Sequence, residues 1–256
     1  MTDASTPAQT ADGVRAALAA AADAGRVPQI ARFFKTAPGG YAEGDRFIGV
    51  TVPETRAVVR RFAGLPPAEV DLLLDSPIHE HRLAALLIMV SQFARASRTR
   101  TRDEAARLQL HAAYLAAVRR GRVDNWDLVD SSAEALVGEL LFTSAPVEQA
   151  EPLLLVELAT SPSVWQRRVA VLATFAATKA GDARPALAIA VRLLDDRHDL
   201  IQKAVGWMLR EVGKRVGRAE LTGFLDAYAT RMPRTMLAYA TEHLTPEARA
   251  AYRAMR

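Results

Sequence analysis

Apolar residues recur every three to four positions along nearly the whole chain, and this periodicity constrains the fold most strongly. It is typical of amphipathic helices, and the period-2 runs of β-branched residues that indicate strands are missing. Proline, Asx and serine residues mark many segment starts, as expected at helix N-termini. The sequence therefore predicts an all-α protein. The expected helices cover 11–25, 27–35, 53–63, 66–75, 78–95, 103–121, 125–142, 147–159, 163–179, 183–194, 198–216, 218–230, 233–242 and 245–255.

A short pattern recurs at three of these helix starts, in 76–86, 161–172 and 199–207. Each copy places a basic residue before a run of small and apolar residues. Such repetition predicts a helical-repeat solenoid, curved, whose concave face carries a basic cleft. Alternatively, the basic residues are ordinary solvated helix charges or pair with neighbouring acids. The three basic residues are Arg82, Arg168 and Lys203.

Composition limits the possible classes of protein. Half of the 256 residues are apolar, enough for a substantial core, so we expect a disordered tail over 1–10 and a single repeat domain over 11–256. Arginine far outnumbers lysine, which suits phosphate binding, although GC-rich coding explains the same bias. The absence of cysteine excludes disulfides, thiolate zinc sites and a cysteine nucleophile. Neither a signal peptide nor a membrane span is apparent, so a cytoplasmic location is expected.

Three tryptophans, Trp126, Trp165 and Trp207, lie about 40 residues apart, the period of a two-helix repeat. Trp126 and Asp130 are four residues apart, as are Lys203 and Trp207, so each pair shares a helix face. This arrangement indicates a site assembled across stacked helices. The alternative is that all three tryptophans belong to the core, as tryptophans at helical spacing usually do.

Segment 35–50 interrupts the helical pattern with four glycines and a proline, which predicts an ordered loop. It lacks the Gly-Lys-Ser/Thr of a phosphate-binding P-loop. The following His79-Glu80-His81 does not have zinc-protease spacing, and Glu80 and Arg82 are expected to cap the helix or to pair. We expect neither a metal nor a cofactor.

Several pieces of the sequence occur in a fixed order: the Pro-Gly-Gly-Tyr at 38–41 through Asp45, the Phe-Ile-Gly-Val at 47–50 with Pro53, the Ile-His-Glu-His-Arg at 78–82, the Asn-Trp-Asp-Leu-Val-Asp at 125–130, the Trp-Gln-Arg-Arg at 165–168 and the segment 201–211. Together they resemble the DNA alkylation repair family of AlkD-like DNA glycosylases, which are built from HEAT-like helical repeats. The Trp-Asp-x-Val-Asp and Gln-Lys-Ala-x-Gly-Trp pieces, in order and at this spacing, are specific together, and the resemblance covers roughly residues 30–215.

The resemblance implies a monofunctional glycosylase that excises cationic N3- or N7-alkylated purines from duplex DNA without base flipping. It implies that Asp130, Trp126 and Trp207 are catalytic and that Arg168 clamps a phosphate, while Trp165 has no assigned role. The other expected DNA contacts are Lys203, Arg210 and Arg82. A monomer associated with the nucleoid when bound to DNA is expected.

Two other classes of protein stay open. One is a family relative that binds damaged or branched DNA without excision. The other is a protein-interaction scaffold, a common use of HEAT-like repeats. Asp130 separates the scaffold from the glycosylase, because a scaffold does not need a carboxylate between two tryptophans in a basic groove.

Overall fold

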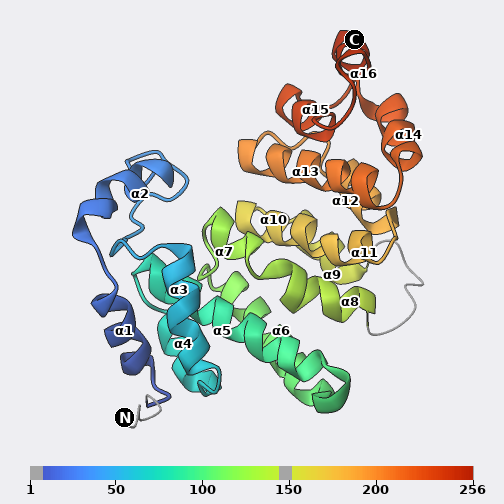
Figure 1. Ribbon diagram of the computed structural model, residues 1–256. Helices are drawn as coiled ribbons and strands as arrows, with labels where there is room; N and C mark the ends of the chain where they lie inside the picture. The colour runs from blue at the N-terminus through green and yellow to red at the C-terminus, as the bar shows by residue number, and fades with distance from the viewer. Residues whose placement is uncertain (1–7, 144–151, 256) are drawn as a thin grey trace. The chain divides into compact units, whose positions relative to one another are not determined.

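The computed structural model describes residues 8–143 and 152–255, and every regular element in these ranges is a helix (Figure 1). The all-α prediction is confirmed. The chain forms two compact units, Met1–Ser132 (unit 1) and Ala133–Arg256 (unit 2). The single domain over 11–256, the HEAT-like repeat and the basic concave cleft stay predictions. Of the tail predicted over 1–10, residues 1–7 lie outside the described residues.

Unit 1 is built around α5 (His79–Ser97), which packs against α3, α4 and α6. Every residue of α5 from His79 to Met89 is buried, so this helix has no solvent-exposed face over its first three turns. A helix buried all round belongs to the centre of its unit. The other elements are α1 (Ala11–Ala20), η1 (Ala24–Arg26), α2 (Val27–Phe33), α3 (Val52–Val59), η2 (Arg60–Phe62), α4 (Pro67–Leu74), η3 (Thr99–Thr101), α6 (Glu104–Arg119) and α7 (Trp126–Asp130).

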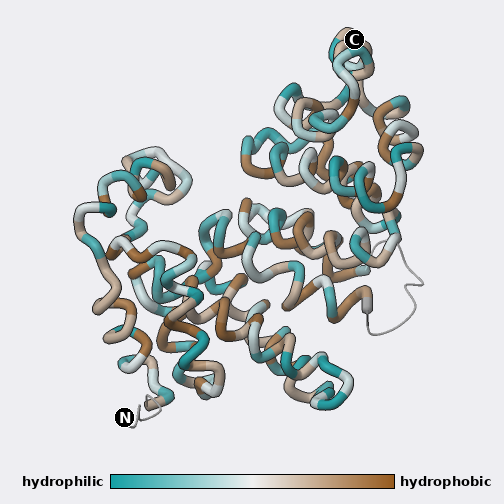
Figure 2. Tube along the Cα trace, viewed as in Figure 1, coloured by the Kyte–Doolittle hydropathy of each residue, from teal (hydrophilic) through white to brown (hydrophobic). Residues whose placement is uncertain are grey.

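Unit 2 is organised around α13 (Asp199–Arg215), which contacts α10, α14 and α15. In contrast to α5, this helix is amphipathic, with a buried face and a largely polar face that is partly exposed. Figure 2 shows this mixture of hydrophobic and hydrophilic residues along the helices of both units. The other elements are the π-helical η4 (Glu134–Gly138), α8 (Glu139–Thr143), α9 (Leu153–Ala159), α10 (Val164–Ala173), α11 (Phe175–Lys179), α12 (Arg184–Arg192), α14 (Arg218–Tyr228), α15 (Arg234–Ala240) and α16 (Pro246–Ala254).

Two helices that the sequence predicts as continuous are interrupted at buried hydroxyl residues. The predicted helix 125–142 ends its first piece at Asp130, and the predicted helix 163–179 is divided at Thr174. At these points Ser132 Oγ donates to the carbonyl of Leu128 at 2.6 Å, and Thr174 Oγ1 donates to that of Val171 at 2.7 Å. Such side-chain bonds compete with the helical hydrogen bonds of the backbone. Apolar periodicity continues through both breaks and therefore does not reveal them.

Within the described ranges, no helix combines the length and the apolar character needed to cross a membrane.

Candidate functional site

The glycine-rich segment before α3 is an ordered loop that one carboxylate ties to the first turn of α5. Glu80 accepts hydrogen bonds from the backbone N–H groups of Ile48, Gly49 and Val50, at 2.9 to 3.2 Å. Position 49 requires glycine, because its φ is +86° and an added Cβ would lie 2.0 Å from the carbonyl oxygen of Asp23. The expected pairing of Glu80 with Arg82 is therefore wrong, since Glu80 binds the loop backbone.

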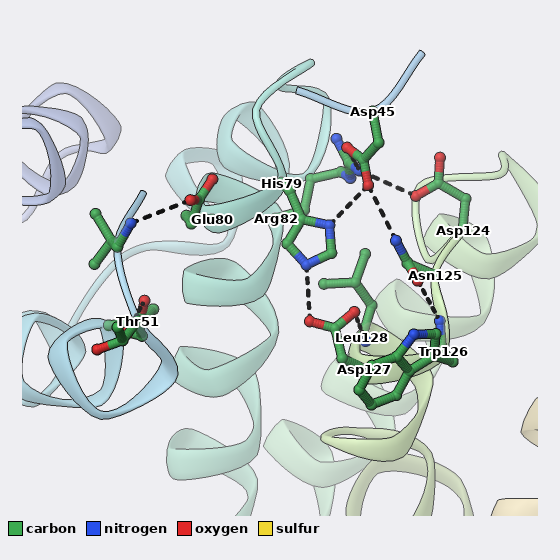
Figure 3. Close-up of polar contacts among 12 residues, drawn as sticks. Asp45, Thr51, His79, Glu80, Arg82, Asp124, Asn125, Trp126, Asp127 and Leu128 are labelled. Carbon is green, nitrogen blue, oxygen red and sulfur yellow. Dashed lines mark hydrogen bonds and ion pairs between the residues drawn. The ribbon is translucent and has the colours of Figure 1, made fainter. Parts of the chain in front are cut away.

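His79, the first residue of α5, connects this loop to α7. Its Nδ1 lies 2.8 Å from Asp45 Oδ2, and its Nε2 lies 2.8 Å from Asp127 Oδ2 (Figure 3). Burial alone would lower the pKa of His79, but its hydrogen bonds to Asp127 and Asp45 and their negative charges raise it to about 9. The imidazole is thus a cation at neutral pH that joins two carboxylates from distant parts of unit 1.

Arg82 completes this buried network from the next turn of α5. Its Nη2 donates to Asp45 at 2.7 Å and lies 3.3 Å from Asp124, and its Nη1 donates to the carbonyl of Ser76. Burial would raise the pKa of Asp45, but the bonds and charges of His79 and Arg82 lower it to about 2. Arg82 is only 5% exposed and bonded within unit 1, so it has a structural role, and whether it also contacts DNA stays a prediction.

The network fixes the start of α7. Asn125, the N-cap residue, donates to Asp45 at 3.2 Å and accepts from the backbone N–H of Trp126 at 2.8 Å. Asp127 accepts from the backbone N–H of Leu128 at 2.9 Å while its other oxygen contacts His79. Because side chains on α5 and in the loop hold both of these residues, the first turn of α7 has little freedom to move.

Aromatic rings surround Trp126. The ring of Phe34 stacks on Trp126 with centroids 5.3 Å apart, and Phe33 meets it edge-on at 5.8 Å. Phe34 also stacks on Phe47, and the indole N–H of Trp126 donates to the hydroxyl of Tyr41 at 3.2 Å. Trp126 remains partly exposed, so one part of the indole is fixed while another part is accessible.

A pocket of about 420 Å³ opens beside this aromatic group within unit 1. Trp126 and Asp130 both line it, so the structure brings these two predicted site residues together. The remaining wall is largely apolar, a composition typical of sites for small organic groups. In the described parts of the chain, no three His, Asp or Glu side chains cluster so as to hold a metal ion. The other lining residues include Phe33, Phe34, Phe47, Val50, Val52 and Arg56.

In unit 2 the predicted phosphate clamp, Arg168, is 5% exposed. It lies on α10, and its Nη1 donates to the carbonyl of Leu200 on α13 at 2.6 Å. The guanidinium therefore joins the two helices. Whether it also contacts a phosphate stays a prediction.

The other residues predicted in unit 2 share one face of α13, as their spacing of four and three residues requires. Trp207 is partly exposed and lies 6.2 Å from the ring of Phe175. Lys203 pairs with Asp199 at 2.6 Å, and Arg210 pairs with Glu242 and, at 3.6 Å, with Glu211. These cations lie nearer the surface than Arg82 or Arg168.

Comparison with protein families finds a match over residues 14–244 to the family described as DNA alkylation repair enzyme. The chain belongs to this family. The predicted resemblance is thus confirmed at the level of the family, and membership supports an enzymatic role in DNA alkylation repair with DNA as the substrate. A search of curated proteins finds no match to this chain.

For this member of the family, the sequence did not predict the residues that support the site. Asp45 and His79 are 34 residues apart, and His79 and Asp127 are 48 apart, too far for helical spacing to reveal contact. The only signal was that all three residues fall inside pieces that carry the family resemblance. Phe34, which stacks on Trp126, lies just outside them.

Proposed function

We propose that this protein is a monofunctional DNA glycosylase that hydrolyses the N-glycosidic bond of cationic N3- or N7-alkylated purines in duplex DNA. The observation that carries the proposal is the pairing of Trp126 and Asp130 on the wall of one pocket, in a chain of the DNA alkylation repair family. A scaffold protein has no use for a carboxylate beside a partly exposed tryptophan whose ring is held by its neighbours.

The proposed reaction releases a base that can leave without being protonated by the enzyme. A purine alkylated at N3 or N7 is already cationic, so its departure requires no strong general acid. As the bond to C1′ breaks, positive charge moves onto the deoxyribose, as in glycoside hydrolysis. Asp130 stabilises this oxocarbenium-like charge and orients the attacking water, which adds at C1′ and loses its proton to give the abasic sugar. We assign no lyase step, since no lysine nucleophile is indicated.

Two tryptophans are proposed to stabilise the same positive charge on the deoxyribose. An electron-rich indole face attracts a nearby cation by about 0.5–2 kcal/mol, and Trp126 and Trp207 are the proposed sugar contacts. The Phe34 stack and the Tyr41 hydrogen bond hold the Trp126 ring in one orientation, so the ring need not be ordered when DNA binds. Lys203 and Arg210 in unit 2 supply proposed phosphate contacts, and Arg168 is the proposed clamp.

We propose further that the base is not flipped into the pocket. Selectivity then arises from the lability of the cationic glycosidic bond. This mode makes a clear prediction about lesion size, because an adduct too large for a pocket of about 420 Å³ would still be excised. If only lesions that fit the pocket are excised, base flipping replaces this part of the proposal.

The decisive experiment measures release of alkylated bases from methylated duplex DNA under single-turnover conditions, for the wild type and Asp130→Asn. We expect the variant to be slower by about 100-fold or more, the usual effect of removing one electrostatic contact to a transition state. Asp12→Asn, which neutralises an exposed carboxylate on α1, is the matched control and should excise at the wild-type rate.

Other results would favour the other classes. DNA binding without base release by the wild type would indicate a non-catalytic damaged- or branched-DNA-binding protein. A wild-type protein that neither binds duplex DNA nor releases alkylated bases would indicate a protein-interaction scaffold. Equal rates for the wild type and Asp130→Asn would remove Asp130 from the mechanism.

A further inference from the structure

Unit 2 contains a second pocket, of about 280 Å³, whose walls carry several basic side chains. Arg210 and Lys214 come from the last turns of α13, Arg218 begins α14, and His243 lies in the turn before α16. Three further residues, Gly213, Leu221 and Leu244, complete the wall, which has no aspartate or glutamate among its described residues. Such a concentration of basic groups favours an anion.

Two neighbouring acids contact one of these basic groups directly, and the charge of Glu211 also acts on Lys214. Glu242 and Glu211 both contact Arg210. Across the described residues, by contrast, no ion pair or side-chain hydrogen bond involves Lys214, Arg218 or His243, and all three side chains are exposed. An anion arriving from solvent therefore meets the cations of Lys214 and Arg218, neither of which must first break an ion pair or a side-chain hydrogen bond.

The start of α14 adds to this environment. Its N-cap residue is Gly217, which has no side chain to accept from the first N–H groups of the helix. The first and fourth residues of α14, Arg218 and Leu221, line the pocket, so these uncapped donors lie at its edge. The helix dipole contributes positive potential at the same end.

The pocket also continues the face of α13 that carries the proposed DNA contacts. Lys203, Trp207, Arg210 and Lys214 follow one another at intervals of four, three and four residues, so they share one face. Eleven residues of helix extend about 16 Å, which corresponds to about five phosphates along one DNA strand. The basic pocket thus lies at the end of a row that begins at Lys203.

We propose that this pocket binds a backbone phosphate of duplex DNA, at a position removed from the lesion. The inference rests on the proposed function only in taking DNA as the ligand. The basic groups recognise the phosphate without reading the base, so this contact adds affinity for any duplex sequence. It extends the binding surface to α14 and to the turn before α16, both beyond the predicted site residues.

The test measures binding of an undamaged, fluorescently labelled duplex by anisotropy at several salt concentrations. We expect Lys214→Gln/Arg218→Gln to weaken binding about tenfold, and to reduce the slope of log K against log salt by about 1, the value for one lost phosphate contact. The control, Arg231→Gln/Arg253→Gln, removes the same charge in the turn after α14 and near the end of α16, and should bind like the wild type.

Equal affinity and equal salt slope for the two double variants would overturn the proposal, as would a wild type that binds no duplex. Thermal unfolding confirms that each variant is folded. Because the duplex carries no lesion, the result is independent of base release. Failure of the proposed function is recognised separately, by a wild type that binds DNA but releases no alkylated base.

Discussion

The two units use charged residues in opposite ways. In unit 1, His79 and Arg82 are buried, and their contacts with Asp45, Asp124 and Asp127 join the loop, α5 and α7. In unit 2, the cations Lys203, Lys214 and Arg218 lie at or near the surface of α13 and α14. Buried charges that satisfy one another position neighbouring groups, whereas an external anion can approach charges that lie at the surface. Similar basic positions in a repeat can therefore have different roles.

The largest expected effect tests the buried side of this comparison. Arg82→Met removes the cation from between Asp45 and Asp124 and leaves the buried carboxylate of Asp45 without it, which typically costs about 3–5 kcal/mol of unfolding free energy. Urea denaturation measures this loss. Lys203→Met, which removes a surface i,i+4 pair with Asp199, should change stability by less than about 1 kcal/mol. Equal losses would contradict the distinction between the units.

The second prediction concerns the pH dependence of His79. Its pKa is raised from 6.5 to about 9, so its stabilising charge is fully present below about pH 6.5 and is lost as the pH rises through 9. A shift of this size corresponds to about 3 kcal/mol. We expect His79→Gln to be less stable than the wild type by about that amount at pH 6, with the difference narrowing by pH 9.5. Denaturant unfolding at both pH values measures it, and a difference independent of pH would refute the ionised bridge.

The third prediction concerns Arg168, a buried cation in unit 2, where the other cations discussed lie at or near the surface. Arg168→Ala leaves the carbonyl of Leu200 without this donor, which costs about 1–3 kcal/mol of stability. If Arg168 also clamps a phosphate, the slope of log K against log salt for duplex binding falls by about 1. Urea unfolding and anisotropy measure the two effects on the same variant. An unchanged salt slope would contradict the phosphate clamp and leave Arg168 with a structural role alone.

The smallest effect concerns the orientation of Trp126. Tyr41→Phe removes the hydroxyl that accepts from the indole N–H, at a cost of about 1 kcal/mol in unfolding free energy. Excision should slow by less than it does in Asp130→Asn, because the Phe34 stack still holds the ring. A Tyr41→Phe enzyme as impaired as Asp130→Asn would give the hydroxyl a direct part in catalysis.

The sequence predicted the helices well where amphipathic periodicity was uninterrupted. The helix expected at 198–216 is observed as Asp199–Arg215, and that expected at 78–95 as His79–Ser97. It did not predict the breaks near Ser132 and Thr174, because one hydroxyl bonding a carbonyl leaves the apolar pattern intact.

For the candidate site, the sequence placed Trp126 and Asp130 on one helix face, and the structure places both on one pocket wall. It treated Arg82, Arg168 and Lys203 as equivalent because they occupy the same position in a repeated pattern. The three basic residues differ in burial because of residues that other helices pack against them, and a local sequence pattern does not contain those residues. Asp45 and Asp127, the partners of His79, could not be predicted for the same reason, since both lie far from it in the sequence.

The hold of Glu80 on the loop has a consequence for hydrogen exchange. Ile48, Gly49 and Val50 belong to no helix or strand, and amides in such segments usually exchange with solvent rapidly. Here each of the three N–H groups is bonded to a carboxylate that is 2% exposed. Exchange requires the loop to separate from the buried end of α5, so these amides should be among the slowly exchanging ones of unit 1. A segment without regular structure would then report the opening of the helix on which the pocket is built.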